Sequence, residues 1–454
     1  MCSSDLKAQA HLEQCGSFVT TRLVTDGFEC HGTLAQNSYL LGKTYRQMSD
    51  YAEAEKAFAE SIDNYQKRGE LRKKRHQEIT NRFERELRQQ EEYLFLTRRV
   101  GIVTGLGLGW LDYTRGRLSS AHQKVITAKI LLWPYEDRLN DAYLNLILGS
   151  IGRCQAGGLK QNRSKLEAAL VTVNDAYGTF RDLKHQRYRA RAAYELALIN
   201  LALADMRNAP HEFAKYISEA STKTREVIAK AQNVPSHRWL SNALVVQSRI
   251  ARKQRKFEQA ETLAEDARAT AHKHRQVLCE IDALIALAEI RLVTAKIAMT
   301  SEASAKRAVK LLERAREELK LARKLNEQTV PRTSDNQNEK IEIVCALNLA
   351  RSFAIQGEQN RARSEYPSRS LILKIEHIDI RMLAAAVDRE IDTLESFPLD
   401  SHSENLSYHS LNKELKRFLM RTAERRGANS EDKLAQALGV TPKAIADWKK
   451  GLAS

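Results

Sequence analysis

The amino-acid sequence predicts an almost entirely α-helical protein, a solenoid of stacked helical hairpins followed by a small three-helix domain. The first observation is composition: only 7 of the 454 residues are proline and 19 are glycine, while 29% are charged and 43% hydrophobic. Such a composition suits long helices. The second is that apolar residues recur at helical spacing through most of the chain. The third is an internal repeat of small and aromatic residues.

The clearest repeat runs from Leu34 to Glu70. Its first helix is predicted to carry Leu41, Gly42 and Tyr45 on one face, and the short polar segment "QMSDY" then forms a turn. The second helix places Ala54 and Phe58 on its inner face. The small residues let the two helices approach closely, and the aromatic rings fill the space around the crossing.

This unit resembles a tetratricopeptide repeat (TPR), whose small and aromatic positions match Gly42, Tyr45, Ala54 and Phe58 in order. The pattern returns at Gly109 and Ala121, and Ala121 lies two periods of about 34 residues after Ala54. Weaker copies surround Ala260, Ala308 and Ala362, and paired amphipathic patterns cover 139–181 and 187–231. The resemblance implies seven or eight hairpins, whose stacking creates a concave face suited to a peptide or protein partner.

Changes in composition divide the chain into four predicted parts. Residues 1–33 form an N-terminal segment or cap, 34–395 the repeat solenoid, 396–410 a serine-rich linker, and 411–454 a separate domain. Within the solenoid, the strongly charged run 67–99 keeps an apolar stripe, which favours one long solvated helix packed on one side over a nucleic-acid-binding patch. The polar segment 329–340 is predicted to be an exposed loop.

The terminal domain is predicted from the spacing of its apolar and turn residues. Leu411 begins a first helix that Gly427 ends, Ser430 caps a second helix, and Thr441 with Pro442 begins a third. The residues of the predicted core and turn are Leu434, Ala435, Leu438, Gly439, Val440, Ile445 and Trp448. A small residue at a helix crossing, a glycine at the turn and apolar anchors on the next helix are what a helix-turn-helix requires.

These residues resemble the helix-turn-helix of DNA-binding regulators, and the arrangement is most similar to the Fis-type domain of bacterial proteins. The stretch "LAQALGV" is also similar to the phage-repressor class. The resemblance implies that the last helix enters the major groove of double-stranded DNA. It places Thr441, Pro442, Lys443, Ala446, Asp447, Lys449 and Lys450 at the DNA. Ten basic residues against five acidic ones in 411–454 support contacts with phosphate.

Net charge, cysteines and the glycine-rich stretch give further information about partners, compartment and function. The formal net charge of +16 favours a polyanionic partner. Six scattered cysteines, without a Cys/His cluster at zinc spacing, indicate a reducing compartment and no metal site. We expect a cytoplasmic protein, because neither a secretory signal nor a membrane span is recognisable. We also expect no cofactor. The glycine-rich "GIVTGLGLG" at 101–109 lacks the strand and the Gly-Lys-Ser/Thr ending of a phosphate-binding loop.

Two hypotheses for function follow from the sequence. In the first, the protein is a DNA-binding regulator, and a homodimer reads a two-fold operator while the solenoid binds a protein or peptide. In the second, it is an interaction scaffold of a larger assembly, such as a defence or mobile-element complex, with only non-specific affinity for nucleic acid. No catalytic group of residues can be assembled, so we expect that the protein is not an enzyme.

Overall fold

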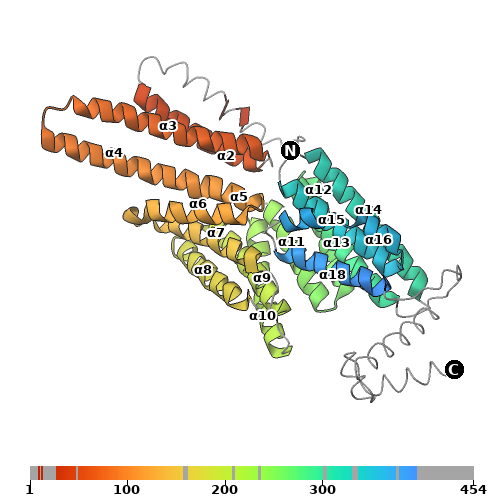
Figure 1. The fold of residues 1–454 in the computed structure, drawn as a ribbon. Helices are drawn as coiled ribbons and strands as arrows, with labels where there is room; N and C mark the ends of the chain where they lie inside the picture. The colour runs from red at the N-terminus through yellow and green to blue at the C-terminus, as the bar shows by residue number, and fades with distance from the viewer. Residues whose placement is uncertain are drawn as a thin grey trace, which may run out of the picture.

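The computed structural model describes residues 9–10, 12–13, 27–47, 50–156, 162–206, 210–233, 237–299, 304–329, 336–374 and 378–395, and every regular element among them is helical (Figure 1). The elements are α2 (Gly27–Gln47), α3 (Tyr51–Gln77), α4 (Arg82–Ile102), η1 (Val103–Gly109), α5 (Trp110–Thr114), α6 (Leu118–Leu132), η2 (Trp133–Tyr135), α7 (Arg138–Ala156), α8 (Arg163–Asp182), α9 (Gln186–Asp205), α10 (Pro210–Asn233), α11 (His237–Lys253), α12 (Phe257–Lys273), α13 (Val277–Ala298), α14 (Ala305–Thr329), α15 (Asn336–Gln356), α16 (Gln359–Glu365), α17 (Arg369–Lys374) and α18 (Ile378–Glu395).

The helices pair into consecutive antiparallel hairpins, as predicted. The hairpins are α2 with α3, the α4–α5 helix with α6, α7 with α8, α9 with α10, α11 with α12, α13 with α14, and α15 with α16, and each packs on the next. We call the two members of a pair its first and second helix. An all-α repeat of helical hairpins is therefore confirmed for the described part of the chain.

Alanines allow the hairpins to close. On the second helices, Ala54, Ala121, Ala260, Ala308 and Ala362 are all completely buried. A side chain this small lets the backbones of two helices approach at the crossing. The buried apolar residues of successive hairpins then merge into shared clusters, of which the largest extends from η1 and α5 through α9. No single hairpin could bury such a surface by itself.

Five connections between helices share one geometry. Each has a residue of positive φ at Gly116, Lys184, Arg255, Arg275 or Gly357. In each case the next residue donates its backbone N–H to the carbonyl oxygen five positions earlier, as in Arg117 to Asp112 at 2.9 Å and His185 to Phe180 at 2.8 Å. This is the Schellman ending of a helix, which satisfies carbonyl groups that would otherwise lack a partner. A repeated local motif therefore sets the repeated turn.

The predicted single helix over 67–99 is wrong, because the chain turns between α3 and α4. Asn81 caps α4 by accepting a hydrogen bond from the backbone N–H of Glu84 at 3.2 Å. The two helices extend side by side as an arm beyond the rest of the N-terminal half (Figure 1). Several stripe residues are exposed on this arm, including Phe83 at 76% and Leu87 at 47%. Apolar residues keep their helical spacing across the turn between α3 and α4, so the spacing did not reveal that turn.

The glycine-rich stretch is part of a helix. The helix continues from Arg82 to Thr114, and η1 is a π-helical segment within it. A Cβ added at Gly105 would lie 2.5 Å from both Ala128 and Leu144, so glycine is required for close packing there. By length and composition this is the one helix in the described residues that could cross a membrane, although buried core helices pass the same test.

The predicted loop over 329–340 is wrong at both ends, since Thr329 belongs to α14 and 336–340 belong to α15, while 330–335 lie outside the described residues. Residues 336–340 are polar but helical, because the packing of α15 on its neighbours outweighs their composition. The predicted linker and helix-turn-helix, 396–454, lie outside the described residues.

A buried ionic network connects α12, α13 and α14. The guanidinium of Arg291, which is only 9% exposed, contacts Glu261 at 2.8 Å and Glu265 at 3.4 Å, and it also donates to Glu318. The second carboxylate oxygen of Glu318 has no hydrogen-bond partner among the described residues. Burial raises the pKa of Glu318 to about 7, and Arg291 acts in the opposite direction. Burial raises this pKa more than Arg291 lowers it, because the single charge of Arg291 is shared among three carboxylates.

This carboxyl group gives a first testable prediction. A pKa above the ordinary value of 4.5 means that the stability contributed by Glu318 is complete below pH 4.5 and is lost as the pH rises to about 7. Relative to Glu318→Gln, the wild-type free energy of unfolding should therefore fall by about 1–3 kcal/mol across this interval. Denaturant titrations of both proteins at several pH values measure it. Parallel pH curves would contradict the assignment.

Candidate binding surface on the first helices

Aromatic and cationic side chains are concentrated where the first helices of several hairpins converge. We call it the Tyr143 cluster; its residues are Lys43 and Arg46 of α2, Trp110 of α5, Tyr143 of α7, Arg187, Tyr188 and Arg191 of α9, and Trp239 of α11. Side chains from the first hairpin thus approach those of the third and fourth. Such convergence is what a curved solenoid produces on its inner face.

Aromatic rings form the floor of this cluster. Tyr143 stacks on Tyr188 with ring centroids 4.5 Å apart, and it lies 6.1 Å from Trp110 in a nearly parallel orientation. Arg191 lies on this floor: its Cζ is 3.4 Å from the centroid of a Trp110 ring, and its Nη1 donates to the Tyr143 hydroxyl at 2.9 Å. A guanidinium held over an aromatic face keeps its charge and a fixed direction for its remaining donors.

The electrostatics of the cluster are strongly positive. Burial by itself would raise the pKa of the Tyr143 phenol, yet that pKa lies below its usual value. The cause is the charge of four neighbouring side chains, Arg191, Arg46, Lys43 and Arg187. Burial lowers the pKa of Arg46 to about 10, and it also lowers the pKa of Lys43. These cations have lost part of their hydration and repel one another, so an anion would be favoured here.

The C-terminal half of the solenoid approaches the same region. Helix α18 contacts α7, although the chain between them forms several further hairpins. On the neighbouring first helices, Asp282 of α13 is exposed to solvent, yet the surrounding protein removes enough water to raise its pKa. The pKa of Glu289 is instead lowered: burial acts upward, but Arg252, Arg249 and Arg351 outweigh it. Next to the Tyr143 cluster, the first helices therefore carry both acidic and basic side chains.

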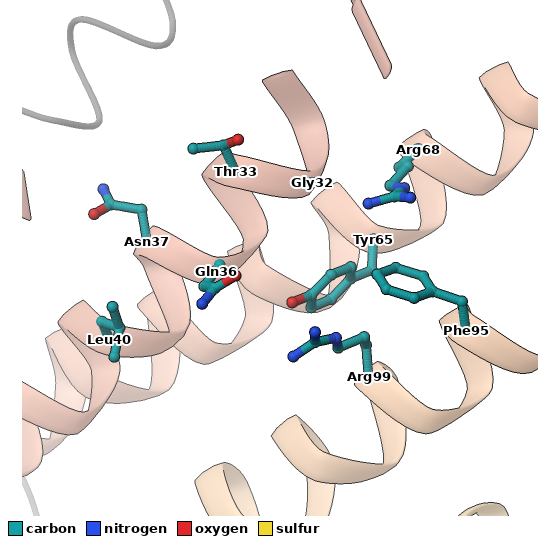
Figure 2. Close-up of a pocket in the computed structure, with 9 residues that line it drawn as sticks. All are labelled: Gly32, Thr33, Gln36, Asn37, Leu40, Tyr65, Arg68, Phe95 and Arg99. Carbon is teal, nitrogen blue, oxygen red and sulfur yellow. The ribbon is translucent and has the colours of Figure 1, made fainter. Parts of the chain in front are cut away.

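A separate open pocket lies among α2, α3 and α4, with a volume of about 430 Å³. Figure 2 shows Tyr65 and Phe95 next to each other, with Arg68 on one side and Arg99 on the other. The Arg68 guanidinium is 4.3 Å from the Phe95 ring centroid and pairs with Glu92 at 3.2 Å. The rest of the lining comes from α2: Gly32, Thr33, Gln36, Asn37 and Leu40. The pocket is therefore lined by two aromatic rings, two arginines and polar side chains of α2.

The predicted repeat residues are found in the packing rather than on a binding surface. Ala54, Phe58 and Ala121 are fully buried, and Gly42 and Gly109 are buried at close helix contacts. Leu41 and Tyr45 are half-buried, and the Tyr45 hydroxyl donates to Glu13 at 2.8 Å. These residues shape the solenoid through packing.

The predicted DNA-binding and core residues of the helix-turn-helix lie outside the described residues, so their placement stays a prediction. Sequence reasoning also missed the Tyr143 cluster. A usable signal was present: Lys43 and Arg46 are three positions apart, and Arg187 and Arg191 four, so each pair shares one face of a first helix. Among the described residues, no group of three His, Cys, Asp or Glu side chains is suited to a metal ion.

Comparison with known proteins finds similarity among solved structures and none among sequences. No protein-family profile matches the chain, and no curated protein sequence is significantly similar. Similar solved structures include a Rap protein complexed with competence and sporulation factor (11% identity, 77% of this chain and 96% of that one, TM-score 0.41). Another is the apo form of the quorum sensor NprR from B. thuringiensis (12% identity, 99% and 98%, TM-score 0.37). A third is a circular tandem repeat protein (12% identity, 99% and 96%, TM-score 0.25).

The class of protein follows from the fold: this chain is a TPR-like helical-repeat protein. At these identities and TM-scores the neighbours carry no argument about a ligand. The kind of ligand is therefore inferred from the side chains of the Tyr143 cluster.

Proposed function

We propose that the protein is a cytoplasmic, non-enzymatic regulator that binds a peptide or an extended protein segment with its first helices and DNA with residues 411–454. The convergence of Lys43, Arg46, Tyr143 and Arg191 from separate hairpins carries the first part. Stacked aromatic rings beside oriented cations suit the apolar and acidic groups of a peptide, and the inner face of a solenoid suits an extended chain.

The DNA-binding part of the proposal rests on the sequence. The spacing of Ala435, Gly439, Ile445 and Trp448 supports a helix-turn-helix, and the excess of basic residues in 411–454 supports contact with phosphate. A single unit of this kind reads only a few base pairs. We therefore propose that a homodimer binds a two-fold operator.

An interaction scaffold remains the alternative, and the arm formed by α3 and α4 favours it. Phe83 is 76% exposed and Tyr93 67% exposed there, and exposed aromatic side chains are common at protein interfaces. A scaffold would retain DNA through its positive charge without preferring any sequence.

Selection of bound sites from random duplex DNA tests the proposal with the full-length protein. We expect an enriched motif, with two-fold symmetry, that Lys443→Ala/Lys450→Ala loses, because a base-reading side chain contributes about 1–3 kcal/mol. The matched control is Lys56→Ala/Lys67→Ala, which removes two exposed lysines from α3 and should keep the motif. Retention of DNA without any enriched sequence would favour the scaffold.

A further inference from the structure

Four cations of the Tyr143 cluster have no acidic partner among the described residues. Lys43, Arg46 and Arg191 are half-buried and Arg187 is exposed, and none of the four forms an ion pair with a described residue. Arg191 is held by Trp110 and Tyr143, and Arg46 donates to the carbonyl oxygen of Leu106 at 3.3 Å. Their contacts orient these guanidinium groups without neutralising them.

Four other cations on the first helices are each paired with a carboxylate, unlike those of this cluster. The pairs are Arg153 with Glu195 at 3.2 Å, Arg252 with Glu289 at 2.8 Å, Arg351 with Glu390 at 3.1 Å, and Lys296 with Glu390 at 2.8 Å. Cations that lose hydration are normally paired, because an unpaired one is costly. Four clustered cations that pair with no carboxylate in the described part of the chain therefore favour an anion from outside.

We propose that Lys43, Arg46, Arg187 and Arg191 form a subsite for a carboxylate of the bound peptide, beside an aromatic floor that takes an adjacent apolar side chain. This inference rests on the proposed binding of a peptide. The carboxylate comes from an Asp or Glu side chain or from the C-terminus of the peptide. Arg191 is already fixed by stacking, so it loses little conformational freedom when it donates to that group.

The distribution of charge favours a peptide over a nucleic acid. A nucleic-acid strand has a phosphate at every nucleotide and requires a continuous basic track. Here Lys43, Arg46, Arg187 and Arg191 gather in one patch around Tyr143. Beyond it, Glu195, Asp282 and Glu289 lie among the cations of the next first helices. One carboxylate on an otherwise uncharged peptide fits this pattern.

The test is affinity selection with the full-length protein from two synthetic pools of random linear heptapeptides, one with free C-termini and one amidated. We expect selected peptides to be enriched in Asp or Glu, or to depend on the free C-terminus, and the pools separate these two sources. Arg46→Gln/Arg191→Gln should weaken the selected peptides by roughly tenfold to a hundredfold, as expected for lost hydrogen bonds to a charged group. Arg163→Gln/Arg181→Gln, at exposed positions of α8, is the matched control and should bind as wild type.

Each other outcome overturns a distinct statement. Selected peptides without dependence on a carboxylate, or with unchanged affinity for Arg46→Gln/Arg191→Gln, would overturn the subsite and leave peptide binding intact. Selection of no peptide from either pool would overturn peptide binding itself. Binding of a labelled oligothymidylate that competes with the peptides, and that the same double variant abolishes, would assign the cluster to nucleic acid. Circular dichroism of every variant checks that it folds.

Discussion

Phe58→Ala is expected to destabilise the N-terminal hairpins by about 3–5 kcal/mol, the range for removing a fully buried aromatic side chain. Phe58 is completely buried, and its ring lies 5.8 Å from that of Tyr39. Gly42 and Gly107 approach it so closely that a Cβ on either would come within 3 Å of the ring. Two backbones surround the ring, so they can close the resulting cavity only in part.

Hydrogen exchange measured by mass spectrometry localises the effect of Phe58→Ala, since a repeat protein can open one hairpin at a time. Exchange should accelerate in α2, α3 and η1 and much less in α13 to α15. The matched control is Phe83→Ala on the arm, where the ring is 76% exposed and the expected change is within about 0.5 kcal/mol. Equal effects of the two substitutions would contradict the packing described for Phe58.

Arg291→Met should destabilise the C-terminal hairpins by a similar amount, about 3–5 kcal/mol, because it leaves the buried carboxyl group of Glu318 without its cation. Glu261 and Glu265 of α12 and Glu318 of α14 would then repel one another across α13. The measurement is the free energy of unfolding in denaturant, with exchange in α12 to α14 as the local readout.

Two further variants make the Arg291 prediction specific. Glu318→Gln in the Arg291→Met background should recover part of the lost stability, because it removes one of the uncompensated charges. Arg361→Met is the matched control: Arg361 is 69% exposed and forms a surface ion pair with Glu358 at 2.7 Å, so about 0–1 kcal/mol is expected. Absence of recovery in the double variant would show that lost packing, rather than charge, causes the effect.

Local sequence patterns predicted the repeat well because hairpins are made by local interactions. The spacing of Gly42, Ala54 and Phe58 indicated which faces meet, and those residues are buried at the contact. The break at Glu78–Asn81 was missed, since the apolar period runs through it and its strongest local signal is the capping side chain of Asn81. Contacts between α3 and α4, such as Tyr65 against Phe95, depend on that break.

The sequence by itself determined the all-α class, the helical hairpins and the residues at their crossings, because helical period, small residues and turns act over a few positions. It also supplies the whole basis for a helix-turn-helix in 411–454. Only the tertiary structure decided that Arg46, Tyr143 and Arg191 meet, and that several cations surround the Tyr143 ring. Their convergence depends on the curvature that accumulates from hairpin to hairpin, and no local pattern encodes that sum.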